Sequence, residues 1–232
     1  MQKSITSIAV RISLFIAFCS FFLSFYYLMH DEQSLTLSNL LVLSGFFIVP
    51  LCIAGFFIVR DTVQIHHKKR IATAIWKVLF AYYIIVFIYI LFLSSEFARD
   101  SYRVFDDYYL ASLKLQWLNH TNLTPFYTIK PMLDVFTFDL HNLATVNILG
   151  NIAVMMPMAL FLPKFFPKLH HPLRFFLTIA LLDAMVEIIQ LLTLSGALDI
   201  DDFILNVSGC MVCYFILQIP VIKKNYVKYF YY

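Results

Sequence analysis

Residues 187–206, EIIQLLTLSGALDIDDFILN, hold the chain's most informative polar side chains. The carboxylates are Glu187, Asp199, Asp201 and Asp202, and the amides are Gln190 and Asn206. The flanking sequences, LTIALLDAMV and VSGCMVCYFIL, are apolar enough to lie in a lipid bilayer. Ionisable side chains at membrane depth are costly and often mark functional sites. This segment is therefore the candidate site.

The spacing of these residues indicates that they share helix faces. Asp183, Glu187 and Gln190 are spaced i, i+4, i+7, so they fall on one side of a helix. Asp202 and Asn206 repeat the i, i+4 spacing on the next apolar segment, where we expect them to face the first group. Three polar residues on one helix face favour a functional role. The alternative is that they form a hydrogen-bond network that holds helices together.

Two kinds of chemistry fit this set of oxygens. Carboxylate and amide oxygens are the ligands that Mg²⁺ and Ca²⁺ prefer, so a divalent-cation site is one reading. Alternatively, Asp199 or Asp201 caps the following helix and Asp202 interacts favourably with its dipole. The sequence leaves both readings open and assigns no cofactor. Glu187 and Asp202 are also the candidates for acid–base catalysis.

A second polar group precedes the fifth apolar segment. Asn147 and Asn151 share a helix face at i, i+4. Gly150 is expected to allow close helix approach, and Pro157 to kink the helix near its centre. We expect these amides to reach the same end of the molecule as the carboxylates and to form one site with them.

Composition sets the class of protein. Of 232 residues, 61% are hydrophobic and 13% charged, whereas soluble domains carry about 25% charged residues. A membrane span needs about 20 apolar residues. Six segments qualify as spans: 5–28, 40–59, 71–93, 148–162 (beginning near residue 142), 173–194 and 203–219. The predicted fold is an all-α integral membrane protein with six transmembrane helices.

The distribution of Lys and Arg predicts the orientation. With the N-terminus inside, the basic residues of the short loops near 60–70 and 164–174 and of the C-terminal tail fall on the cytoplasmic side. The chain is therefore predicted to be N-in and C-in, with a long outer loop (95–146) that includes a candidate interfacial helix. The net charge of +3 is accounted for by these loops, which leaves no basic face for nucleic acid.

The polar groups also divide the chain. Residues 1–94 carry few of them and are expected to form an N-terminal half of three helices. Residues 95–232, with the outer loop and the last three spans, carry nearly all of the candidate site residues.

Four motifs carry a resemblance to a known family. They are Asn122-Leu-Thr-Pro125-Phe126; Asn147-x-x-Gly150-Asn151 with Pro157; Glu187-Ile-Ile-Gln190; and Gly196-Ala197-x-Asp199-Ile200-x-Asp202-x-x-x-Asn206-x-x-Gly209. In this order and spacing the chain resembles the VanZ-like family of bacterial membrane proteins over residues 95–219. Many relatives have an Arg shortly before the first motif, where this chain has Asn119 and His120.

The resemblance implies a cell-envelope protein of the bacterial plasma membrane, associated with tolerance of the glycopeptide teicoplanin. The implied partners are membrane lipid and a lipid-linked envelope precursor or a lipoglycopeptide. Candidate ligand-binding residues are Asn122, Pro125, Phe126, Asn147, Asn151, Glu187, Gln190, Asp199, Asp202 and Asn206. The first hypothesis is non-enzymatic binding of such a ligand in the outer leaflet. The alternative is a membrane-embedded enzyme that acts on a lipid-linked substrate through Glu187 and Asp202.

Overall fold

The computed structural model describes residues 2–30, 37–94, 107–139 and 142–222. Within these residues, six helical segments are long and apolar enough to cross a membrane. Their elements are α1 (Gln2–His30), α2 (Leu37–Asp61), α3 (Ile65–Ile88) continued by a π-helical turn (Tyr89–Leu93), α6 (Leu143–Val154) with α7 (Met158–Phe165), α8 (Pro172–Leu192) and α9 (Ile200–Gln218). A short 3-10 turn (Pro167–His170) joins α7 to α8. The predicted all-α membrane fold with six spans is confirmed.

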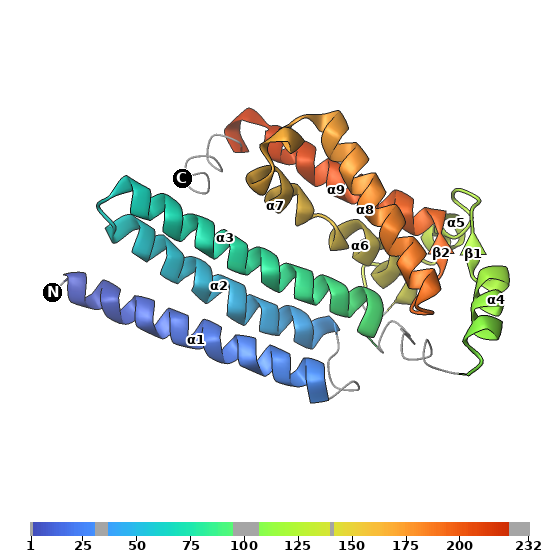
Figure 1. The fold of residues 1–232 in the computed structure, drawn as a ribbon, viewed down its shortest axis with the longest axis horizontal. Coiled ribbons are helices and arrows are strands. Elements are labelled where there is room, and N and C mark those ends of the chain that lie inside the picture. The colour runs from blue at the N-terminus through green and yellow to red at the C-terminus, as the bar shows by residue number, and fades with distance from the viewer. Residues whose placement is uncertain (1, 31–36, 95–106, 140–141, 223–232) are drawn as a thin grey trace.

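The long helices form two groups that meet at α3 (Figure 1). Helices α1 and α2 pack along each other, and α9 packs against α6, α7 and α8. The main core contains Phe87 and Leu91 from α3 and the continuing turn, together with Phe175, Ile179 and Tyr214 from α8 and α9. The last residues of α3 therefore pack with the C-terminal group. The division into 1–94 and 95–232 stays a prediction.

The fourth span is broken at its centre. Helix α6 ends at Val154, and α7 begins after Pro157, which has no N–H to continue the helical ladder. The break leaves backbone carbonyls that need donors in an apolar environment. The Tyr83 hydroxyl of α3 donates to the Val154 carbonyl at 2.8 Å. The kink expected at Pro157 is thus a complete interruption of the helix.

One glycine controls how closely α6 and α9 approach. A Cβ added at Gly209 would lie 2.0 Å from the Ile152 carbonyl oxygen. A Cβ added at Gly150 would meet nothing within 4 Å, and Gly150 is exposed. The expectation that Gly150 allows close helix approach was therefore wrong, because its α-carbon faces away from α9. Gly209 has that role.

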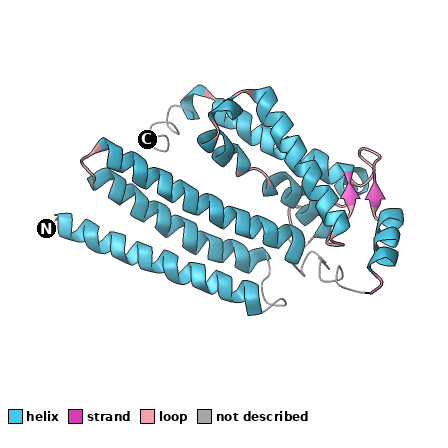
Figure 2. Ribbon diagram, viewed as in Figure 1, coloured by secondary structure: helices cyan, strands magenta, loops and turns pink. Residues whose placement is uncertain are grey.

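Two very short strands lie at the end of the molecule away from the N-terminus (Figures 1 and 2). Strand β1 (Thr121–Asn122) pairs in parallel with β2 (Leu198–Asp199). Helix α4 (Tyr109–Asn119) runs across this end rather than along the long helices (Figure 1), and α5 (Ile129–Asp134) follows β1. We call this the strand end; the charge pattern predicts that it is the outer end.

Helix α4 is attached to the end of α8 through one face. The Tyr109 hydroxyl donates to the Leu192 carbonyl at 2.7 Å, and the Gln116 amide donates to the Gly196 carbonyl at 2.8 Å. These two donors lie two helical turns apart. The apolar side chains on the remaining surface of α4 are exposed: Leu110, Leu115, Trp117 and Leu118. The predicted interfacial helix thus has a counterpart in α4, while residues 95–106 of the outer loop lie outside the described residues.

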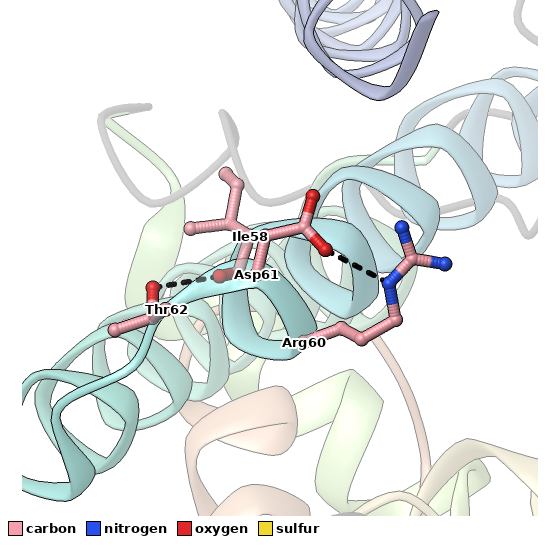
Figure 3. A network of polar contacts seen from close by, with 4 residues as sticks. All are labelled: Ile58, Arg60, Asp61 and Thr62. Atoms are coloured by element: carbon pink, nitrogen blue, oxygen red, sulfur yellow. Dashed lines mark hydrogen bonds and ion pairs between the residues drawn. The ribbon is translucent and has the colours of Figure 1, made fainter. Parts of the chain in front are cut away.

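The opposite end of α2 carries a small surface network (Figure 3). Arg60 Nε lies 2.9 Å from Asp61 Oδ1, and the Thr62 hydroxyl donates to the Ile58 carbonyl at 2.7 Å. The Arg60 guanidinium also lies over the Phe57 ring, 4.8 Å from its centroid. These contacts end α2 on the side that the charge pattern predicts to be cytoplasmic.

Candidate functional site

Helix α9 begins at the strand end with Asp199 as its N-cap. The Asp199 side chain accepts the backbone N–H of Asp201 through Oδ1 at 2.8 Å. The same oxygen accepts the Asn122 amide of β1, also at 2.8 Å. Asp199 therefore caps the helix, as one of the two expected readings had it, and fixes β1 beside β2.

Asp201 is completely buried and holds the outer loop in place. One carboxylate oxygen accepts the backbone N–H of Phe126 at 2.5 Å. The other accepts the Thr128 N–H at 2.7 Å, the Thr128 hydroxyl at 2.8 Å and the Ile129 N–H at 3.1 Å. These donors surround the N-terminus of α5, where a negative charge is stabilised. Phe126 has φ of 64°, a conformation that non-glycine residues seldom adopt.

Sequence reasoning treated Asp201 as a helix cap at most, and this reading was wrong. Its partners are 72 to 75 residues away in the chain. A local pattern cannot indicate such a contact, and the neighbouring Asp199 and Asp202 were preferred as candidate ligand-binding residues.

The side chains of Glu187 and Asp202 lie on facing elements below the strands. Glu187, which is 4% exposed, accepts the Asp199 backbone N–H at 3.2 Å. Asp202 accepts the Asn151 amide of α6 at 2.5 Å. Asn151 also donates to Asn147 one turn earlier, at 3.3 Å. The expected proximity of the α6 amides to the carboxylates is thus present in the structure.

The deepest pair is Asp183 on α8 and Asn206 on α9. They are 1% and 4% exposed, and the Asn206 amide donates to Asp183 Oδ1 at 3.0 Å. The remaining acceptors, Asp183 Oδ2 and Asn206 Oδ1, are buried and have no hydrogen-bond partner among the described residues. Two buried acceptors side by side leave the pair short of a donor.

Gln190 does not contact the other predicted site residues through its described hydrogen bond. Its side chain is buried, and its amide donates to the Leu91 carbonyl at 3.0 Å. Leu91 lies in the π-helical turn that ends the third span. Gln190 therefore joins α8 to α3.

These residues form an interior layer that we call the carboxylate–amide layer. Its members are Asp183, Glu187, Asp199, Asp201, Asp202, Asn122, Asn147, Asn151 and Asn206. Asp183 and Glu187 lie one turn apart on the buried face of α8, and Asp202 lies in the first turn of α9. In the described part of the chain, no group of three or more His, Cys, Asp or Glu residues is placed to hold a metal ion.

A cavity of about 530 Å³ opens directly above this layer, between the outer loop and β2. We call it the loop cavity. Its lining residues are Asn119, His120, Thr121, Asn122, Leu123, Thr124, Tyr127, Thr128, Ala197 and Asp199. Of the predicted ligand-binding residues, Asn122 and Asp199 line the cavity. Pro125 and Phe126 are exposed beside it.

The family model of VanZ/LLP1 matches residues 80–222, which is more than half of the chain. The chain belongs to the VanZ/LLP1 family. Searches of curated proteins and of solved structures found no match. Family membership and the six apolar helices together make it a multi-pass membrane protein.

The VanZ/LLP1 match contains both the carboxylate–amide layer and the loop cavity. It begins within α3, before Tyr83 and Leu91, and ends after α9. The match therefore includes Tyr83, which donates to the Val154 carbonyl at the helix break, and Leu91, whose carbonyl accepts the Gln190 amide. It also includes the outer loop. Residues before 80, which supply α1 and α2, lie outside the match. The VanZ/LLP1 segment is thus the part of the chain in which function is to be sought.

Proposed function

We propose that this protein binds the polar part of a lipophilic or lipid-linked glycopeptide-type ligand at the strand end, without transforming it. VanZ-like proteins are associated with glycopeptide resistance, and binding would contribute to tolerance of teicoplanin at the bacterial plasma membrane. The ligand's apolar part would stay in the adjoining leaflet, whose lipid the exposed apolar faces of α4 and α8 are suited to contact.

The observation that carries this proposal is the position of the loop cavity. Hydrogen-bonding side chains dominate its lining, and ligand sites commonly fix orientation with a few such groups. Its floor includes Asp199, which links β1, β2 and α9, and Glu187 supports Asp199 from below through its backbone N–H. The cavity is thus held by groups that are already positioned before a ligand arrives.

Filling the cavity tests the proposal without removing a hydrogen bond. Ala197 lines the cavity, and its methyl group takes part in no polar contact, so Ala197→Trp occupies the space. Ala111→Trp on the exposed surface of α4 is the matched control. We expect the wild type and Ala111→Trp to raise the inhibitory concentration of teicoplanin in a sensitive host and to bind it saturably in nanodiscs. Ala197→Trp should do neither. Equal behaviour of the two variants would refute the proposal.

A second candidate is an enzyme that acts on a lipid-linked envelope substrate. The observation that favours it is the placement of three carboxylates on neighbouring elements: Asp183 and Glu187 lie one turn apart on α8, and Asp202 lies in the first turn of α9. Proton-transfer groups are often built from such clusters. The combined variant Glu187→Gln and Asp202→Asn separates the two candidates. Retained teicoplanin binding and tolerance in this variant would sink the catalytic reading, whereas turnover of a lipid-linked precursor by wild-type protein, lost in the variant, would replace the binding proposal.

A further inference from the structure

The lining of the loop cavity has an unbalanced charge. Among the described residues it contains one carboxylate, Asp199, and no Lys or Arg. The basic residues of the described segment 107–139, Lys114 and Lys130, are exposed and are not part of the lining. Among the described residues, an anion that entered the cavity would therefore meet a negative charge and no Lys or Arg.

The lining presents a free acceptor oxygen on Asp199 and a hydroxyl on Thr121 that can donate or accept. Both hydrogen bonds of the Asp199 side chain involve Oδ1, and no bond among the described residues involves Oδ2. The Thr121 hydroxyl is a buried lining group that has no partner within the described residues. The Asn122 side chain, in contrast, is used at both ends, since it donates to Asp199 and accepts the Thr124 N–H at 3.0 Å.

We propose that the loop cavity selects a headgroup rich in hydroxyl or amine donors and rejects a phosphate. The inference rests on the proposed function and narrows its ligand class. Hydroxyl and ammonium groups donate to a free carboxylate oxygen and gain charge-assisted hydrogen bonds. A fully ionised phosphate has only acceptor oxygens, so it would be repelled by Asp199 and would leave the oxygen unused. The cavity thus fits a sugar or amino-sugar portion of a lipophilic ligand.

The test compares lipids that differ only in their headgroup. The full-length protein is placed in phosphatidylcholine nanodiscs with glucosyl diacylglycerol, glucosaminyl diacylglycerol or phosphatidic acid of the same acyl chains. Native mass spectrometry and competition then give relative affinities. We expect both glycolipids to bind at least about tenfold more tightly than phosphatidic acid, a difference that a single charged contact can supply.

Charge variants identify the group responsible. Asp199→Asn keeps an N-capping side chain and removes the charge, because Asn caps helices as well as Asp. It should lower the preference for the glucosaminyl lipid over phosphatidic acid by about five- to tenfold. Asp134→Asn, at an exposed position of α5 outside the cavity, should change nothing.

The outcomes are distinct. Phosphatidic acid that binds as tightly as the glycolipids, or an Asp199→Asn variant that matches Asp134→Asn, overturns the headgroup inference alone. If no probe binds saturably and Ala197→Trp also leaves teicoplanin tolerance unchanged, both the headgroup inference and the proposed function fail.

Discussion

Replacing Gly209 with Ala would force α6 and α9 apart. The added methyl group would lie 2.0 Å from the Ile152 carbonyl oxygen, 2.8 Å from its carbonyl carbon and 2.9 Å from its α-carbon. All three are backbone atoms, so no side-chain rotation relieves the clash. The helices must separate by about 1 Å for the shortest contact to reach 3 Å, below which real Cβ atoms are essentially never found.

The magnitude follows from three contributions. Overpacking costs about 1–3 kcal/mol. Movement of Ile152 also strains the adjacent Asn151–Asp202 hydrogen bond, and a bond to a charged group is worth about 1.5–3 kcal/mol. Alanine recovers about 1 kcal/mol of helix propensity relative to glycine. The net loss in unfolding free energy is therefore about 1.5–5 kcal/mol.

Thermal unfolding of the purified protein in detergent measures this loss. For a chain of this size the midpoint should fall by about 5–15 °C. Gly150→Ala is the matched control, since the same substitution on α6 meets nothing within 4 Å. Its midpoint should stay the same or rise slightly. If Gly209→Ala were as stable as Gly150→Ala, the close packing of α6 against α9 would be disproved.

Three further experiments probe the buried polar contacts. Asp201→Asn loses a charge that accepts four hydrogen bonds and should destabilise the outer loop by about 2–4 kcal/mol; faster hydrogen exchange over residues 122–134 than in Asp134→Asn would show it. Tyr83→Phe removes the donor at the α6–α7 break and should cost about 1 kcal/mol, measured as a lower unfolding midpoint. In a double-mutant cycle, Asp183→Leu and Asn206→Leu together should cost less than the sum of the single changes, because the pair is removed without leaving either partner unpaired. Additive costs would argue against this contact.

The sequence was sufficient to predict the spans because their signal is local. Runs of apolar residues identify each membrane helix wherever it packs, and the six predicted segments correspond to the six found. Pro157 restricts the backbone wherever it occurs, so a kink in the fourth span was predicted, whereas the complete interruption between Val154 and Met158 was not. The assignment of close packing to Gly150 failed because a glycine shows only that close approach is allowed. Which neighbour lies opposite is decided by tertiary packing.

The site was predicted in part for a similar reason. Helical spacing placed Asp183 and Glu187 on one face, and both are buried toward α9 or β2. The parallel pairing of β1 and β2 was not predicted, since strands of two residues have no periodicity to detect. The dominant role of Asp201 was also missed, because its donors are supplied by a distant turn. The loop cavity exists only after these long-range contacts have formed.

The buried carboxylates share one structural principle, which bears on how the site must be tested. Each accepts hydrogen bonds from N–H groups of a different segment: Asp201 from the outer loop, Glu187 from β2, Asp202 from α6 and Asp183 from α9. Such bonds offset part of the cost of burying a charge and also tie the segments together around the cavity. Loss of tolerance after a carboxylate substitution would therefore report either a lost ligand contact or a loosened fold. Ala197→Trp separates these outcomes, because it blocks the cavity while every one of these bonds remains.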